Sequence, residues 1–347
     1  MKKINFSVLK PILKSLPYNL FVWFFLVLYL SPVFFMVTTA IMPSEQLGDK
    51  DAPLYPARIT PYVYKGKEYQ IYNVPVDGDV KHWALIHPGR ETSQFIDPQH
   101  PEKGLITWKG NWSSLKGVYE FHIAWSNFSS ILSSLPFPRM LRNTLILTVV
   151  GEVGVLISSI IVAYGFARFP LPGGNLLFYV LIATILIPEK ITFIPTFFMY
   201  IRTLQWRGTF YPLLVHLFFG NAVYIFLLRQ NFKSFPADLE EAAMLDGAGP
   251  LRRLFSIILP QSWHVVITVS LLHFFYTWNE TRLASLYLGV NSKLMPISFA
   301  VQNFQTLVPI ENVIEASTVI VLIVPVIFLF LAQKYFMQGV IVTGSEK

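Results

Sequence analysis

Five ionisable side chains interrupt long apolar stretches of this 347-residue sequence: Glu152, Glu189, Lys190, Glu280 and Arg282. If those stretches cross a bilayer, each charge there is costly, so these residues are candidates for the lining of a solute pathway. Adjacent helical residues do not face one another, so Glu189 need not pair with Lys190, whereas the other charges can meet partners on other helices. Interhelical ion pairs or snorkelling would explain such charges equally well without any solute.

The tripeptide Trp278-Asn279-Glu280 adds a second chemical possibility. Its amide and carboxylate can accept hydrogen bonds from hydroxyl groups. The indole of Trp278 offers a flat apolar face to a sugar ring. This combination suits a neutral, polyhydroxylated solute. We therefore predict a substrate pathway that includes Glu189, Trp278, Asn279, Glu280 and Arg282.

The sequence lacks the residue motifs that are typical of catalytic sites. No Ser/His/Asp arrangement or metal-ligand spacing is visible, so we expect no catalytic residue and no metal ligand. Asp246-Gly247-Ala248-Gly249 could pass for a phosphate-binding loop, but no strand precedes it and no Lys-Ser or Lys-Thr follows. The absence of cysteine excludes disulfides and thiol nucleophiles. The net charge of +7 comes from scattered residues, so no nucleic-acid partner is expected.

A polar segment between two apolar stretches has the start signals of a short helix. Ser234 can cap such a helix, and Pro236 suits its first turn. Asp238, Glu240 and Glu241 then place negative charge at the positive end of the helix dipole. We expect a short helix to begin here.

The same segment has the end signals of a helical hairpin. Gly247 can adopt the left-handed conformation that ends the first helix. A second helix is predicted from Leu251 to Ile258, and Pro260 should stop it. The result is a compact helix–turn–helix knob whose small side chains could enter a groove of another protein.

This knob resembles the EAA loop of ABC importer permeases. The matching residues, each at the family's spacing, are Glu241, Ala242, Ala243, Asp246, Gly247, Ile257, Leu259 and Pro260. The resemblance implies that residues 229–262, here called the EAA loop, form a coupling element that docks on a cytosolic ATPase subunit. It also implies that ATP and Mg are held by the ATPase pair, and that this chain is not an enzyme and binds no cofactor itself.

Composition points to the bilayer as the solvent for most of the chain. Apolar residues make up 53% of the sequence, only 14% are charged, and the mean hydropathy is +0.50. We predict an all-α polytopic membrane protein with six spans. They are Tyr18–Ile41, Asn143–Ala167, Leu176–Tyr200 with kinks at Pro188 and Pro195, Tyr211–Leu228, Val265–Leu288 and Ile314–Ala332.

Basic residues set the expected topology. Lys2, Lys3, Lys10 and Lys14 precede the first span, which is too long for a cleaved signal peptide, so the amino terminus should be cytosolic. The EAA loop carries its own basic residues, Arg229, Lys233, Arg252 and Arg253, and is placed inside by the same rule. A tail of residues 333–347 should also be cytosolic.

Residues 43–135, here called the insert, differ in composition from the rest. They are too many for a bare connector and read as a small β-rich extracytoplasmic module, with strands near 65–74, 83–86 and 105–108. Its tryptophans, Trp83, Trp108, Trp112 and Trp125, are expected to form its core rather than to stack on sugars. The histidines His82, His87 and His100 lack metal-ligand spacing. The domain boundaries are thus 1–42, 43–135 and 136–347.

Within the ABC importer permeases, this chain resembles the carbohydrate group most. In that group it is similar to the second permease subunit of the maltose transporter. The resemblance rests on the EAA loop and on Phe137-Pro138-Arg139, Arg142-Asn143-Thr144, Ile187-Pro188, Ile194-Pro195, Trp278-Asn279-Glu280 and the tail segment Gln333–Phe336 with Gly339 and Gly344. It covers the first span and residues from Phe121 onward, but the insert has no counterpart, and the ending Gly344-Ser345-Glu346-Lys347 departs from the group's pattern.

This resemblance implies the type I importer permease fold in the inner membrane of a bacterium. The implied partners are a second, different permease chain, two ATPase subunits, an extracytoplasmic solute-binding protein and the lipid bilayer. The implied substrate is a carbohydrate, an oligosaccharide by preference. The alternatives are a permease for a polyol phosphate or another non-sugar solute, an ion-coupled secondary transporter, and a membrane enzyme.

Overall fold

The computed structural model describes residues 6–76, 78–289 and 292–344. The side chains of residues 6–16, 189 and 335–344 lie outside the described part, as do residues 1–5 and 345–347 entirely. The sequence predictions for the amino-terminal lysines, for Glu189 and for the tail after Lys334 therefore concern side chains that the structure does not describe. The chain forms two compact units, residues 1–133 with 308–320, and residues 134–307 with 321–347.

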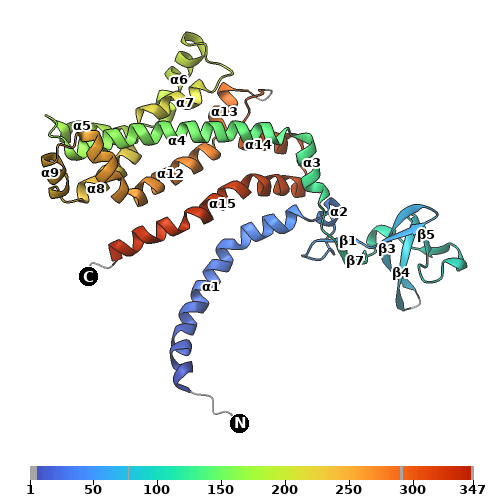
Figure 1. The fold of residues 1–347 in the computed structure, drawn as a ribbon. Coiled ribbons are helices and arrows are strands. Elements are labelled where there is room, and N and C mark those ends of the chain that lie inside the picture. The colour runs from blue at the N-terminus through green and yellow to red at the C-terminus, as the bar shows by residue number, and fades with distance from the viewer. Residues whose placement is uncertain (1–5, 77, 290–291, 345–347) are drawn as a thin grey trace. The chain divides into compact units, whose positions relative to one another are not determined.

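The first unit combines a long apolar helix with two antiparallel sheets (Figure 1). Its helices are α1 (Phe6–Ala40), α2 (Ser44–Leu47) and α3 (Ser126–Ser134). Its strands are β1 (Ala57–Ile59), β2 (Pro61–Tyr64), β3 (Lys67–Val76), β4 (Asp79–His87), β5 (Thr92–Ile96), β6 (Ile106–Lys109) and β7 (Tyr119–Phe121), with 3₁₀ turns at Pro101–Lys103 and Trp112–Ser114. The larger sheet has the order β2-β3-β4-β5-β6, and β1 pairs with β7.

The β-rich insert predicted from the sequence is confirmed by these sheets. The turn Lys65-Gly66 has positive φ at both residues, which suits a tight hairpin between β2 and β3. Trp83 is buried in the core on one sheet face, with Trp108 and Trp112 packed against it. The prediction of a core position is wrong for Trp125, which is 67% exposed at the start of α3.

Residues 308–320 join the first unit through the side chain of Asn312. Its Nδ2 donates to the carbonyl of Met42 (2.9 Å) and to Oδ1 of Asn127 (3.2 Å). Asn127 in turn donates to the carbonyls of Ala40 and Met42. Since all these polar groups are buried, each needs such a partner, and the three chain segments are held together by this network. No local pattern in the sequence indicates this network, since its members are distant along the chain.

The second unit is helical. Its elements are α4 (Phe137–Arg168), α5 (Gly174–Ala183), η3 (Thr184–Leu186), α6 (Glu189–Phe198), η4 (Met199–Thr203), α7 (Tyr211–Leu214), η5 (Val215–Phe219), α8 (Ala222–Ser234), α9 (Asp238–Leu245), α10 (Pro250–Arg253), η6 (Leu254–Ile258), α11 (Leu259–Gln261), α12 (Trp263–Trp278), α13 (Arg282–Tyr287), α14 (Ile297–Leu307) and the later part of α15 (Glu311–Gly344). The long helix α4 packs against α8, α12 and α14, and is the axis of this unit (Figure 1).

Among the described residues, four helices are long and apolar enough to cross a membrane: Pro17–Ala40, Phe137–Arg168, Tyr211–Ser234 and Glu311–Lys334. Two bent pairs raise the number to six if each pair is one span. They are Gly174–Leu186 with Lys190–Thr203, bent by 91°, and Pro250–Gln261 with Trp263–Trp278, bent by 83°. The predicted kink at Pro188 lies at the first of these bends. The helix breaks there because a proline holds the residue before it in an extended conformation, and Ile187 has that conformation.

The prediction that Pro260 stops a helix is wrong. Pro260 lies inside the helical segment, in α11, and the break comes two residues later at Ser262. Proline has no N–H, and its ring crowds the carbonyl four residues earlier. The turn that precedes it, Leu254–Ile258, is a wider π-helix, which accommodates such a residue.

The span predicted from Val265 to Leu288 is likewise not one continuous helix. α12 ends at Trp278, and α13 begins at Arg282. Asn279 and Glu280 therefore lie in the connection rather than on a helix face, which changes the directions in which they can point.

Candidate functional site

The EAA loop folds into the predicted hairpin of short helices. α9 ends at Leu245, and Gly247 has a φ of +75°, as the sequence predicted. The N–H of Ala248 donates to the carbonyl of Ala243 at 2.8 Å and closes the helix end. A Cβ at Gly247 would meet nothing within 4 Å, so the backbone conformation rather than space requires glycine there.

Most of the residues that resemble the EAA pattern lie at the surface of this chain. Glu241, Ala242, Asp246, Gly247 and Pro260 are exposed, and Ala243, Ile257 and Leu259 are half-buried. Large apolar side chains of the same loop are also exposed, namely Leu239, Met244, Leu245, Leu251 and Phe255. Leu245 is 91% exposed. An apolar surface of this kind is typical of a docking site for another protein.

Glu240 is the residue of this loop that the sequence analysis undervalued. Its side chain is buried, and its Oε1 lies 2.8 Å from Nε of Arg168 at the end of α4. The hydroxyl of Tyr164 donates to its Oε2 at 2.9 Å, and Arg253 lies 3.9 Å from the same oxygen. The sequence suggested only a helix-dipole role, because Arg168 and Tyr164 are more than seventy residues away.

The start of α9 also differs from the prediction. Ser234 does not cap it, because Ser234 is the last residue of α8 and its hydroxyl donates to the carbonyl of Asn231. In the described part of the chain, no side-chain hydrogen bond caps the amino terminus of α9. Arg168 instead fixes this connection, since its Nη2 donates to the carbonyl of Phe235 at 2.9 Å. The knob is thus tied to α4 by buried charge rather than by a local cap.

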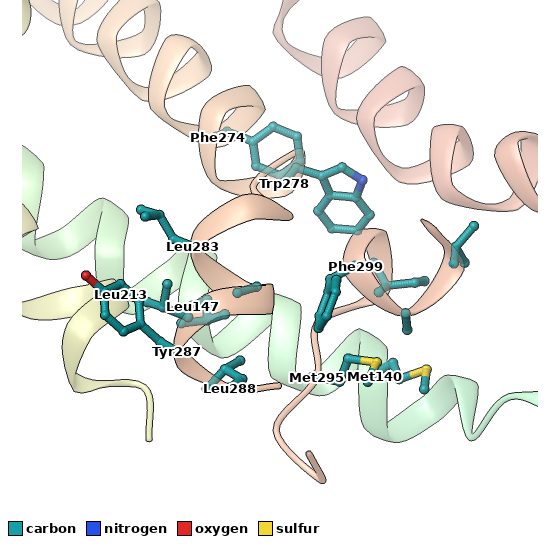
Figure 2. Packing of buried hydrophobic residues seen from close by; sticks show 14 of the residues in the cluster. Met140, Leu147, Leu213, Phe274, Trp278, Leu283, Tyr287, Leu288, Met295 and Phe299 are labelled. Carbon is teal, nitrogen blue, oxygen red and sulfur yellow. The ribbon is translucent and has the colours of Figure 1, made fainter. Parts of the chain in front are cut away.

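Trp278 is part of the protein core. It is 1% exposed, and its ring stacks on Phe274 with the centroids 5.6 Å apart (Figure 2). Its Nε1 donates to the carbonyl of Val321. Ser298 donates to its carbonyl. In this arrangement no indole face is open to a solute, so the position of Trp278 supports a packing role.

The other predicted pathway residues are not brought together into one cluster. Asn279 is exposed and donates to the carbonyl of Phe275. Arg282 lies over the ring of Phe193, at 5.8 Å from its centroid. Glu280 accepts a 2.6 Å hydrogen bond from the N–H of Leu283 and so caps α13. Glu280 also lines a pocket of the second unit.

Two adjoining pockets occur in the second unit, and they share His216, Tyr276 and Leu283. The larger contains about 880 Å³ of empty space. Its lining is aromatic and neutral polar, with Thr192, Phe193, Thr196, Tyr200, Pro212, Asn221 and Tyr287 beside the shared residues. The smaller pocket adds Glu280 and Thr277 to a mainly aliphatic wall. No Lys or Arg lines either pocket among the described residues.

Glu152, which the sequence singled out, has a partner that the sequence did not reveal. Nδ1 of His273 lies 2.9 Å from its Oε2, and Nε2 of His273 lies 3.2 Å from the hydroxyl of Thr277. His273 is 1% exposed. This chain of contacts links α4 to α12 and reaches the wall of the smaller pocket, so it supports the interhelical explanation of Glu152.

Comparison with known proteins gives the class of protein. Residues 154–342 match the model of the family described as "Binding-protein-dependent transport system inner membrane component". The match covers more than half of the chain, and the chain belongs to this family. It is therefore an inner-membrane permease component of a transporter that works with a binding protein, as the resemblance implied.

Individual relatives of this chain are also transport permeases. An osmoprotective compounds uptake permease protein from Synechocystis sp. is 29% identical over 261 residues, which cover 73% of this chain and 85% of that protein. An sn-glycerol-3-phosphate transport system permease protein of Yersinia pestis is 30% identical over 235 residues, which cover 64% of this chain and 81% of that protein.

The fold is shared with a solved structure. A chain of a bacterial ABC transporter involved in the import of the acidic polysaccharide alginate matches with a TM-score of 0.63 and 20% identity, over 93% of this chain and 96% of that chain. At this identity the similarity shows the fold only, and it is the type I ABC permease fold that the sequence predicted.

Proposed function

We propose that this chain forms one half of the transmembrane pathway of an ATP-driven importer for a neutral carbohydrate, an oligosaccharide by preference. A different permease chain supplies the other half, two cytosolic ATPase subunits hold ATP and Mg, and an extracytoplasmic binding protein delivers the solute. The chain itself carries no catalytic residue and no cofactor. It crosses the bacterial inner membrane six times, the two bent helix pairs each counting as one span, and both of its termini are cytosolic.

The observation that carries the choice of solute is the lining of the two adjoining pockets. Hydroxyl, amide and aromatic groups can exchange hydrogen bonds with sugar hydroxyls and pack against sugar rings. An anionic solute would find no Lys or Arg in the described lining and would meet the carboxylate of Glu280. This argues against a polyol phosphate, although one relative is named for the transport of sn-glycerol-3-phosphate.

The proposed coupling follows from the EAA loop. Its exposed apolar side chains dock on the ATPase, and Glu241, Ala242, Ala243, Asp246, Gly247, Ile257, Leu259 and Pro260 shape the docked surface. Closure of the ATPase pair on ATP then moves the knob, and the buried contact between Glu240 and Arg168 passes this movement to α4. The transporter is thereby switched between inward-facing and outward-facing states by a remote energy source.

The test is solute-stimulated ATP hydrolysis and import by the complete complex in liposomes. We expect a neutral oligosaccharide delivered by the binding protein to stimulate both, and sn-glycerol 3-phosphate to stimulate neither. A Gly247 substitution should abolish coupling. An ion-coupled carrier would instead import the solute without ATP and would tolerate that substitution, and this result would refute the proposal.

A further inference from the structure

A groove lies within the first unit, at the base of the insert. It is lined by Pro43–Glu45, by Arg58, Ile59 and Pro61, by Glu68–Gln70, and by His122, Ala124, Ser126 and Asn127. Its cavity volume is about 490 Å³, which lies within the range of small-molecule sites. Nothing in the transport mechanism derived above uses it.

The walls of this groove are held in place by specific contacts. Nε2 of Gln70 donates to Oε2 of Glu45 at 2.9 Å, which joins the sheet to the start of α2. Nε of Arg58 lies 2.8 Å from Oε1 of Glu120. Asn127 is buried and pinned to two backbone carbonyls. A site whose walls are fixed in advance loses little entropy when a ligand binds.

Several polar groups of the lining are left for a ligand. The carboxylate of Glu68 and the imidazole of His122 make no hydrogen bond or ion pair within the described part of the chain. Arg58 uses only its Nε in the ion pair with Glu120. The groove thus offers both acceptors and donors. A metal ion is not a fitting ligand, since no group of three or more His, Cys, Asp or Glu side chains among the described residues could hold one.

Three tyrosines lie beside the groove, on the face of β2 and β3 opposite to Glu68 and Gln70. Tyr69 lines the groove and lies directly opposite Tyr62 on the neighbouring strand. Tyr64 follows two residues after Tyr62, and all three rings pack on the same sheet face, where they are half-buried. Tyrosine combines a flat apolar face with a hydroxyl tip, which matches the two kinds of surface that a sugar presents.

We propose that the groove, with Tyr69 at the strand beside it, binds a short segment of a neutral glycan. Hydroxyl groups of the glycan bond to Glu68, His122 and Arg58, and a sugar ring stacks on Tyr69. An acidic glycan is disfavoured, because Glu45 and Glu68 both line the groove while Arg58 is already paired with Glu120. The inference rests on the proposed carbohydrate transport for its physiological meaning, but the site itself can be tested without transport.

The experiment measures oligosaccharide binding to the complete transporter in lipid nanodiscs, without binding protein, by saturation-transfer NMR and calorimetry. The probes are maltopentaose and an alginate pentasaccharide. The variants are Tyr69→Leu, which keeps apolar packing, and Glu68→Gln, which changes an exposed side chain and should not disturb folding. Matched controls are Tyr55→Leu and Glu91→Gln, both exposed in the insert and outside the groove lining.

We expect maltopentaose to bind, the alginate pentasaccharide to bind at least tenfold more weakly, and each groove variant to lower maltopentaose affinity at least fivefold while the controls do not. Absence of wild-type binding, or equal affinities in groove and control variants, would overturn the inference. A second measurement adds the binding protein to the same nanodiscs, and groove variants that bind it more weakly while keeping wild-type maltopentaose affinity would also overturn the inference, because the groove would then be a protein docking site.

The two proposals can fail separately. Carbohydrate-stimulated import with no binding in the groove would leave the transport function standing and remove the site. Glycan binding in the groove with ATP hydrolysis that no carbohydrate stimulates would support the site and remove the transport assignment.

Discussion

Replacement of Glu240 by glutamine tests how the EAA loop is held on the rest of the chain. The amide keeps the shape of the side chain and can still accept from Tyr164, but it removes the charge that lies 2.8 Å from Arg168. Arg168 is 13% exposed and would be left largely buried without its counter-ion. Removal of one partner from a buried pair costs about 3–5 kcal/mol, and the partial exposure and the bond to Phe235 favour about 3 kcal/mol here.

The expected consequence is uncoupling. A loss of about 3 kcal/mol lowers the ratio of knobs held on α4 to knobs released from it by roughly two orders of magnitude. The ATPase subunits would then move the knob without moving α4. The complex should hydrolyse ATP and import solute at a much lower ratio of solute to ATP, and its thermal midpoint in detergent should fall.

The neighbouring residue provides a matched control. Glu241 is exposed, so Glu241→Gln should change stability by no more than about 0.5 kcal/mol. Its expected defect is weaker association with the ATPase, measured by co-purification, with an unchanged thermal midpoint. If Glu240→Gln imports with the wild-type ratio and melts at the wild-type temperature, the anchoring argument is wrong.

Three further perturbations have defined outcomes. Gly247→Ala should cost about 1–2 kcal/mol, because an L-residue there is strained at a φ of +75°, and should lower ATP-driven import in liposomes; an unchanged rate would contradict this. Glu280→Ala removes the cap on the N–H of Leu283 and should cost about 1 kcal/mol, seen as faster hydrogen exchange over α13 but not over α14. Burial and the hydrogen bond to Asp49 raise the pKa of Tyr119 above its ordinary value of 10.0. The resulting stabilisation of the insert should be complete below pH 10.0 and lost as the pH rises through the raised pKa. Tyr119→Phe should show a smaller loss in a fluorescence-detected denaturation series, because burial also raises the pKa of Tyr72 in the same insert.

Local rules explain what could be predicted from the sequence. The turn at Gly247 needs only a residue that tolerates positive φ, and the break at Pro188 needs only the restriction that proline places on its predecessor. The strands of the insert follow from β-branched and aromatic runs between turn residues. These features depend on a few neighbouring residues, so a single sequence is sufficient to place them.

Long-range partners explain what could not be predicted. In the sequence, Glu240 is one of three acidic residues at the start of a helix. Its buried contacts with Arg168 and Tyr164 are visible only in the folded structure. Glu152 was visible as a charge in a span, but its partner His273 is 121 residues away. Trp278 was interpreted as a ligand surface from its type, whereas its burial depends on the packing of α12, α14 and α15.

α4 contacts three separate parts of the second unit. Arg168 and Tyr164 at its end hold the knob, and Glu152 near its middle contacts His273 on α12. Near its other end, Asn143 donates to the carbonyls of Lys293 and Met295 in the segment before α14. The helix has 32 residues and is therefore about 48 Å long. It contains no proline beyond its first turn, which removes one common cause of a kink, and we expect a displacement of the knob to be passed along the helix.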